Sequence, residues 1–244
     1  MQIAIVLYSG MTTLDAVGPY EVLRFIPNAD VRFVSREPGP VVTDAGVLVL
    51  GATHSYADTP APDIVLVPGS EANTMTAMAD GQLLNWLRQV HKTTRFTLSV
   101  CSGALILASA GILKGHAATT HWIAQDMLTQ FGAEPQPNKR IVKSGKIVTA
   151  AGVSAGIDLG LFIVGELCGQ ERAEVIQLLI EYDPQPPFGS GHPSKASKAV
   201  LDIARAEMLE RAKNPRNAIS VPLIMWRNVL ERVRAKAFGA SRVG

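Results

Sequence analysis

Short apolar segments rich in β-branched residues alternate with longer helix-like segments along most of this sequence. The apolar segments lack a polar–apolar alternation, which is typical of strands buried on both faces of a parallel sheet. Such strands are expected at residues 3–7, 31–34, 47–50, 64–67, 96–100 and 147–149. Helices are expected at residues 14–25, 71–91, 102–110, 120–131 and 154–167. This order predicts an α/β sandwich with a doubly wound, mostly parallel sheet.

Turn residues divide the chain further. Asp-Ala-Gly at 44–46 predicts a hairpin over residues 41–50 beside the main sheet, and residues 143–146 predict a second turn before the last strand. A proline-rich segment at 184–189 interrupts regular structure after a helix expected at 172–182. We therefore expect an α/β domain over residues 1–190 and a helical C-terminal extension over residues 191–244.

The C-terminal extension is basic, although the chain carries a net charge of only +2. Residues 1–194 hold 12 basic and 17 acidic residues, whereas residues 195–244 hold 11 basic and 4 acidic ones. Helices are expected at residues 195–211 and again after Pro215, where Trp226 lies on an apolar stripe. This pattern favours packing on the body or on a second subunit over binding nucleic acid.

Composition excludes several classes of protein. Hydrophobic residues make up 47% of the 244 residues and charged residues 18%, which is incompatible with a disordered chain. No apolar run approaches the ~20 residues of a membrane span, and the first residues lack the pattern of a secretory signal. Two cysteines form no disulfide framework, so a reducing, cytoplasmic compartment is expected.

The segment around Cys101 carries the strongest chemical signal. A buried strand is expected to end there, and a helix of small and apolar residues follows at once, which predicts a nucleophile elbow with strained backbone at Cys101. Gly103 and Ala104 are small enough to let the helix approach the strand. The helix N-terminus favours a thiolate, which predicts a lowered thiol pKa. The alternative is a buried structural cysteine.

Two other strand ends carry polar residues. Asp15 follows the first strand, and Pro68-Gly69-Ser70 follows the strand at 64–67. Ligands bind outside the carboxyl ends of parallel strands, so these residues are expected to share one crevice with Cys101. Alternatively, Asp15 complements a helix dipole and Ser70 caps a helix.

The remaining candidates are less specific. His121 is interpreted as a pocket residue near the thiol or as a helix-start histidine, and Trp122 as a substrate wall or a core residue. Cys168 is expected to pack within a helix. The other histidines lack the spacing of metal ligands, and no glycine-rich nucleotide motif is present, so neither a metal nor a cofactor is predicted.

As an ordered set, these segments resemble the DJ-1/PfpI superfamily and, within it, the isonitrile hydratases. The resemblance covers about residues 2–190 and is carried by residues 15–23, 67–70, 100–104, 118–122, 152–158 and 179–188. It implies a flavodoxin-like fold, a homodimer, and Cys101 as nucleophile with Asp15 as its acidic partner. Ser102 stands where isonitrile hydratases commonly have threonine, and Ser70 where the superfamily often has glycine. His121 corresponds to the superfamily's histidine near the cysteine.

The resemblance implies hydration of an isonitrile to an N-substituted formamide. Cys101 would attack the terminal carbon, Asp15 would supply a proton and then activate water, and the amides of Gly69, Ser70 and Ser102 would stabilise negative charge. Two alternatives remain open. One is a glyoxalase- or deglycase-like enzyme of the same superfamily. The other is a non-enzymatic sensor, similar to the N-terminal domain of AraC-type regulators.

Overall fold

The computed structural model describes residues 1–211, 213 and 224. Its centre is a seven-stranded sheet in the order β10-β11-β7-β6-β1-β2-β5. Every neighbouring pair is parallel except β10 and β11, which form the hairpin predicted around residues 143–146. The strands are β1 (Gln2–Val6), β2 (Asp30–Ser35), β5 (His54–Ser55), β6 (Ile64–Val67), β7 (Phe96–Ser99), β10 (Ile141–Ser144) and β11 (Ile147–Ala150). The predicted doubly wound, mostly parallel sheet is confirmed.

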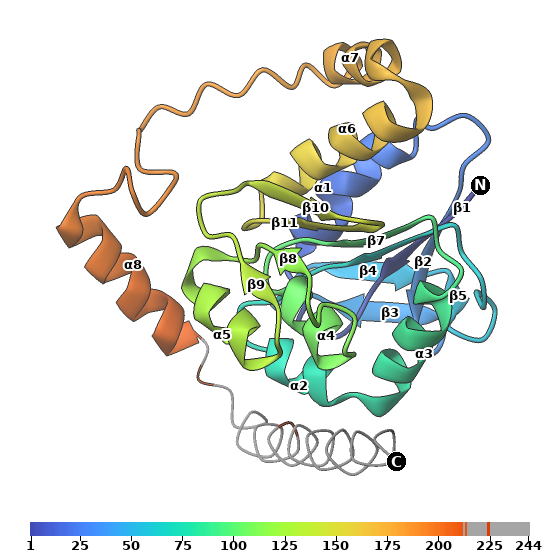
Figure 1. The fold of residues 1–244 in the computed structure, drawn as a ribbon, viewed down its shortest axis with the longest axis horizontal. Coiled ribbons are helices and arrows are strands. Elements are labelled where there is room, and N and C mark those ends of the chain that lie inside the picture. Colours follow the sequence, from blue (N-terminus) through green and yellow to red (C-terminus); the bar gives the residue numbers. More distant parts are fainter. Residues whose placement is uncertain (212, 214–223, 225–244) are drawn as a thin grey trace, which may run out of the picture.

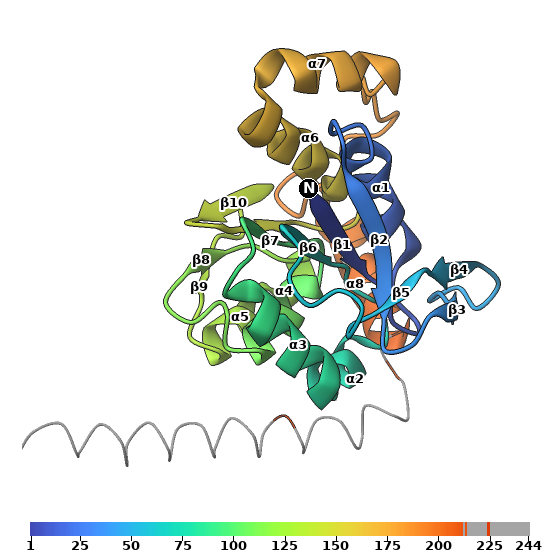
Figure 2. The same cartoon turned by 90° about the vertical axis from the view of Figure 1, so that its right-hand side faces the viewer.

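Helices cover both faces of this sheet (Figures 1 and 2). On one face lie α1 (Thr13–Leu23) and α6 (Ala155–Cys168), and on the other α3 (Gly81–His91) and α4 (Gly103–Ser109). Successive side chains of β1 enter opposite cores: Ile3 and Ile5 pack under α1 and α6, whereas Ala4 and Val6 pack under α3 and α4. Burial on both faces explains why the strands read as continuous apolar segments.

The helix expected at residues 71–91 is in fact two helices, α2 (Thr74–Ala79) and α3. Asp80 separates them because its backbone is extended and its carboxylate accepts hydrogen bonds from the amides of Gln82 and Leu83. This N-cap ends one helix and begins the next. The helix expected at residues 120–131 is also shorter: it begins with the 3₁₀ turn η1 (Trp122–Ala124) and continues as α5 (Gln125–Gln130).

Short strands lie outside the main sheet. The expected hairpin is confirmed as β3 (Gly39–Val42) paired with β4 (Val49–Ala52). Its turn is exposed, with Val47 88% accessible, so residues 47–50 are not a strand buried on both faces. A second small sheet, which the sequence did not indicate, pairs β8 (Ala117–Ala118) with β9 (Glu134–Pro135).

The C-terminal part returns to the body after a long connection. Helix α7 (Gln170–Leu179) is followed by residues 180–197, which contain no helix or strand, and then by α8 (Lys198–Arg211). In Figure 1, α8 runs beside the body, and its C-terminal end is the part of the helix nearest to it. The helix expected after Pro215 lies outside the described residues. Among the residues described, no helix has the length and apolar character needed to cross a membrane.

Candidate functional site

The turn between β7 and α4 is a sharp strand–turn–helix bend with Cys101 at its apex, and the predicted backbone strain at Cys101 is confirmed. Cys101 has a φ of 56°, a left-handed conformation that is unfavourable for a residue with a side chain. Two hydrogen bonds hold it there: its amide donates to the Ala151 carbonyl at 2.9 Å, and its carbonyl accepts from the Thr120 hydroxyl at 2.8 Å. A Cβ on Gly103 would lie 2.1 Å from the Val67 carbonyl oxygen, so only glycine lets α4 begin this close to the strand.

The structure brings Asp15 to Cys101. Asp15 lies on α1, is fully buried, and accepts a hydrogen bond from the Gly69 amide at 2.8 Å. Burial raises the pKa of Asp15 from 3.8 to about 7, although hydrogen bonds from Gly69 and from the Cys101 side chain oppose this rise. A carboxyl group with this pKa exchanges a proton readily at neutral pH.

The predicted lowering of the thiol pKa is wrong. Burial, and next the charge of Asp15, raise the pKa of Cys101 well above its usual value, and hydrogen bonds from the Ser102 and Val153 amides offset this only in part. Cys101 is 6% exposed, and desolvation beside a carboxylate outweighs the N-terminus of the short helix α4. At neutral pH Cys101 is therefore a thiol, and Asp15 is the group that titrates.

Two backbone amides expected to stabilise negative charge are already engaged. The Gly69 amide donates to Asp15, and the Ser70 amide donates to the Ser102 hydroxyl at 3.0 Å. The amides that interact with the sulfur are those of Ser102 and Val153. Gly69 has a steric role instead, because a Cβ there would lie 2.5 Å from the Ser102 nitrogen.

The hydroxyl of Ser102 belongs to a buried polar network. It donates to the Ser70 carbonyl at 3.1 Å and lies 2.7 Å from the Thr74 hydroxyl. The Ser70 hydroxyl in turn donates to the Gly10 carbonyl at 2.6 Å. These bonds tie together the loops that follow β1, β6 and β7, so Ser70 and Ser102 position the elbow relative to Asp15.

A pocket of about 210 Å³ opens beside Cys101. Its lining is mainly apolar and comes from several helices and loops: Ser70, Glu71, Thr74, Met75, Cys101, Ser102, Leu105, His121, Ile123, Ala124, Met127, Met208 and Leu209. His121 is thus placed in the pocket, where burial lowers its pKa and keeps the ring neutral at pH 7. Within the described part of the chain, its buried Nδ1 has no hydrogen-bond partner.

Trp122 does not line this pocket. Its ring lies beside His121, with centroids 5.6 Å apart, and the wall position expected for it is taken by Ile123 and Ala124. The 3₁₀ turn at η1 changes which side chains face inward compared with the continuous helix that was expected.

Sequence reasoning missed two polar groups near the thiol. Val153 has a φ of 30°, unusual for a β-branched residue, and its amide is one of the groups that lower the pKa of the Cys101 thiol. It follows β11, which neighbours β7, so the strand-end rule could have found it. The Tyr8 hydroxyl donates to the Pro68 carbonyl at 3.0 Å, and its pKa is raised by burial and next by the charge of Asp15.

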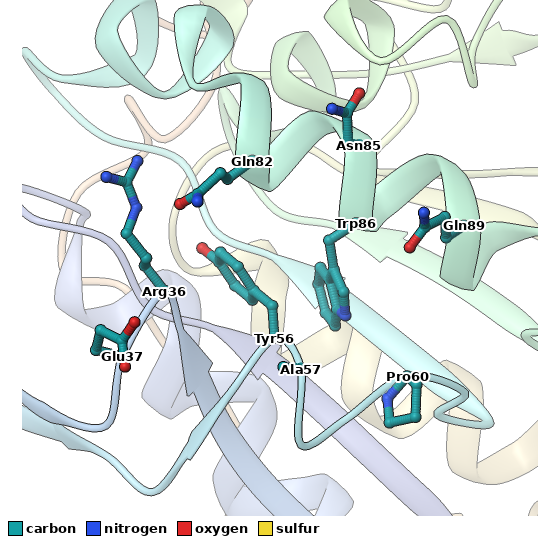
Figure 3. A pocket seen from close by; sticks show the side chains of 9 residues that line it. All are labelled: Arg36, Glu37, Tyr56, Ala57, Pro60, Gln82, Asn85, Trp86 and Gln89. Atoms are coloured by element: carbon teal, nitrogen blue, oxygen red, sulfur yellow. The ribbon is translucent and has the colours of Figure 1, made fainter.

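A larger hollow of about 420 Å³ lies elsewhere, across β5 and α3 (Figure 3). Its floor is the stacked pair Tyr56 and Trp86, with ring centroids 4.9 Å apart. It is lined by Arg36, Glu37, Tyr56, Ala57, Pro60, Gln82, Asn85, Trp86 and Gln89, which include no nucleophilic thiol or hydroxyl apart from the phenol.

In the part of the chain that the structure describes, no cluster of three potential metal-ligating side chains occurs. The chemistry therefore centres on Cys101.

Known proteins share this arrangement of elements. Residues 1–166 match the DJ-1/PfpI family. The chain is 40% identical to an isonitrile hydratase from Pseudomonas putida, over 84% of this chain and 89% of that protein. It is 28% identical to the HTH-type transcriptional regulator CdhR from Pseudomonas aeruginosa, over 68% of this chain and 49% of the regulator. A crystal structure of a ThiJ/PfpI family protein from Pseudomonas syringae superposes with a TM-score of 0.81 at 36% identity, covering 90% of each chain.

Proposed function

Because the chain belongs to the DJ-1/PfpI family, we propose that it is an enzyme that adds water to an isonitrile and releases an N-substituted formamide. One observation carries the proposal: a buried carboxyl group with a pKa of about 7 lies near a buried thiol whose backbone is strained, beside a mainly apolar pocket. The similarity to an isonitrile hydratase supports the same reaction.

The first half of the reaction forms a covalent adduct. Asp15, ionised above its pKa of about 7, takes the thiol proton as the sulfur of Cys101 attacks the terminal carbon of R–N≡C. Asp15 then gives this proton to the same carbon. The product is the thioimidate R–N=CH–S–Cys101, and the carboxylate is restored. A stable thiolate is not required, which agrees with the raised thiol pKa.

The second half consumes water. Asp15 takes a proton from a water molecule whose oxygen attacks the thioimidate carbon, and the nitrogen receives that proton. The tetrahedral adduct R–NH–CH(OH)–S–Cys101 then collapses: the C–S bond breaks, the hydroxyl proton moves to sulfur, and R–NH–CHO leaves. The amides of Ser102 and Val153 stabilise negative charge on the departing sulfur.

The pocket suits an uncharged substrate. Met75, Leu105 and Ile123 offer apolar surface to the R group, and the neutral ring of His121 adds no charge.

Product analysis tests the proposal. The protein is incubated with a simple alkyl or aryl isonitrile and, separately, with methylglyoxal. Formation of the N-formyl product without lactate is expected, because Cys101 attacks the isonitrile and water then releases the formamide. Lactate without the formamide would contradict the proposal and favour a glyoxalase-like enzyme.

A sensor is the second candidate, and the similarity to the regulator CdhR favours it. In that case the pocket would bind a small apolar molecule without converting it. Saturable isonitrile binding by calorimetry, with neither product formed, would identify a sensor and refute the enzymatic proposal.

A further inference from the structure

Part of the Cys101 pocket is built by a helix far along the chain. Met208 and Leu209 of α8 line the same pocket as Cys101. The next turn of α8 places Arg211 in an ion pair with Glu71 at 3.2 Å, and Glu71 also lines the pocket. The C-terminal end of α8 therefore lies at the pocket.

Helix α8 is held against the body by few contacts. None of its residues is buried, and Leu209 is 58% exposed although it lines the pocket. Both side chains of the Arg211–Glu71 ion pair are accessible to water, so the pair adds little stability. An element with so little buried surface separates from the body at low free energy, while the core remains folded.

The connection to α8 permits such a movement. Residues 180–197 contain no helix or strand, and hydrogen bonds within this connection are local, such as that from the Lys195 amide to the His192 carbonyl. The start of the connection is fixed, because the Tyr182 hydroxyl donates to Asp158 at 3.1 Å. With one end anchored and a long irregular segment beyond it, α8 can swing without unfolding the sheet.

We propose that α8 is a lid over the Cys101 pocket, that Met208 and Leu209 contact the R group of the isonitrile and limit its size, and that the Arg211–Glu71 pair holds the lid closed. The size selection rests on the proposed hydratase function. Cys101 is only 6% exposed, and Met208 and Leu209 line the pocket beside it, so movement of α8 widens the substrate's approach to the sulfur.

Substrate selection tests the role of Met208. The Met208→Ala variant enlarges the pocket, so kcat/KM for a bulky aryl isonitrile relative to a small alkyl isonitrile should rise about tenfold. The Ile203→Ala variant is the matched control: Ile203 is an apolar residue of the same helix, 60% exposed, that does not line the pocket. An unchanged ratio in Met208→Ala, or the same change in both variants, would overturn the size selection.

The role of the Arg211–Glu71 ion pair in holding the lid closed is tested by a measurement that does not depend on hydratase activity. Iodoacetamide alkylation of Cys101 is followed by peptide mass spectrometry, with Cys168 on α6 as the internal reference. Arg211→Gln should accelerate alkylation of Cys101 about two- to fivefold, the range expected for loss of an exposed ion pair, and leave Cys168 unchanged. Arg205→Gln, on the same helix, should behave like the wild type. Equal rates of Cys101 alkylation in the wild type and in Arg211→Gln would refute the role of the Arg211–Glu71 pair in holding the lid closed.

The two measurements separate the lid from the reaction. Faster alkylation in Arg211→Gln in a protein that hydrates no isonitrile would support the lid and refute the hydratase function. Formamide production with unchanged alkylation and an unchanged substrate ratio would refute the lid and leave the hydratase function standing.

Discussion

For single residues, the chemistry depends on which atom holds one proton. Asp15 and Cys101 are both buried, and burial disfavours a charge on either. The pKa of the Asp15 carboxyl is raised only to about 7, so it still ionises near neutral pH. The pKa of the Cys101 thiol is raised well above its usual range. Asp15 is thus the base of the pair. The proton leaves the thiol only as the sulfur attacks.

This assignment predicts the pH dependence of catalysis. Because Asp15 must be ionised to accept the thiol proton, kcat/KM should be constant above pH 7 and fall about tenfold per unit below it. Rates of formamide production from pH 5 to 9 check this, with the Cys101→Ala variant giving the uncatalysed background. A profile that is flat through pH 7 would contradict the role of Asp15.

The same pKa predicts a pH dependence of stability. The pKa of Asp15 in the folded protein lies above its value of 3.8 in the unfolded chain. The contribution of Asp15 to the free energy of unfolding is therefore fully present below pH 4 and is lost as the pH rises through about 7. The loss amounts to about 4 kcal/mol. Chemical denaturation at pH 4 and pH 8 should therefore show that Asp15→Asn gains stability relative to the wild type at the higher pH.

The control for this measurement is Asp126→Asn, which changes an exposed carboxylate. Its unfolding free energy should follow the wild-type pH dependence. If Asp15→Asn followed that dependence as well, the raised pKa of Asp15 would be disproved.

At the scale of elements, close packing of α1 on α6 delivers Asp15 to the elbow. A Cβ on Gly160 would lie 2.8 Å from the Val22 Cβ, and a Cβ on Gly156 3.0 Å from Pro19. These glycines let the two helices approach closely.

Gly160→Ala should therefore destabilise the fold by about 1–3 kcal/mol and lower kcat, because α1 must shift and carries Asp15 with it. Gly165→Ala on the same helix is the control. A Cβ there would meet nothing nearer than 3.9 Å, and the better helix propensity of alanine should leave stability unchanged or raise it by up to about 1 kcal/mol. Thermal unfolding and activity assays compare the two, and equal stability of both variants would contradict the close packing.

The elements of the site could be predicted from the sequence because they obey a local rule. Asp15, Gly69 and Cys101 each follow a parallel strand, and β1, β6 and β7 are neighbours in the sheet. The pKa of Cys101 could not be predicted, since it depends on burial by the whole surrounding structure. The helix break at Asp80 was also missed, because an aspartate inside an apolar periodic segment caps a helix only when the backbone opens there.

At the scale of the whole molecule, α8 was expected as a helix, but its place over the pocket was not. An 18-residue connection without regular structure carries no information on where the helix it precedes will dock. The homodimer implied by the family resemblance remains a prediction. Light scattering should give twice the 26.0 kDa mass of one chain, and a mass of 26.0 kDa would contradict it.

The proposed reaction takes place at the sulfur of Cys101, which attacks the isonitrile. The direct measurement is formamide production by Cys101→Ala and by Cys168→Ala, each first shown by its unfolding curve to be folded. Cys168→Ala should match the wild type, whereas Cys101→Ala should lose at least about 10⁴-fold in kcat. Turnover by Cys101→Ala at the wild-type rate would contradict the covalent mechanism.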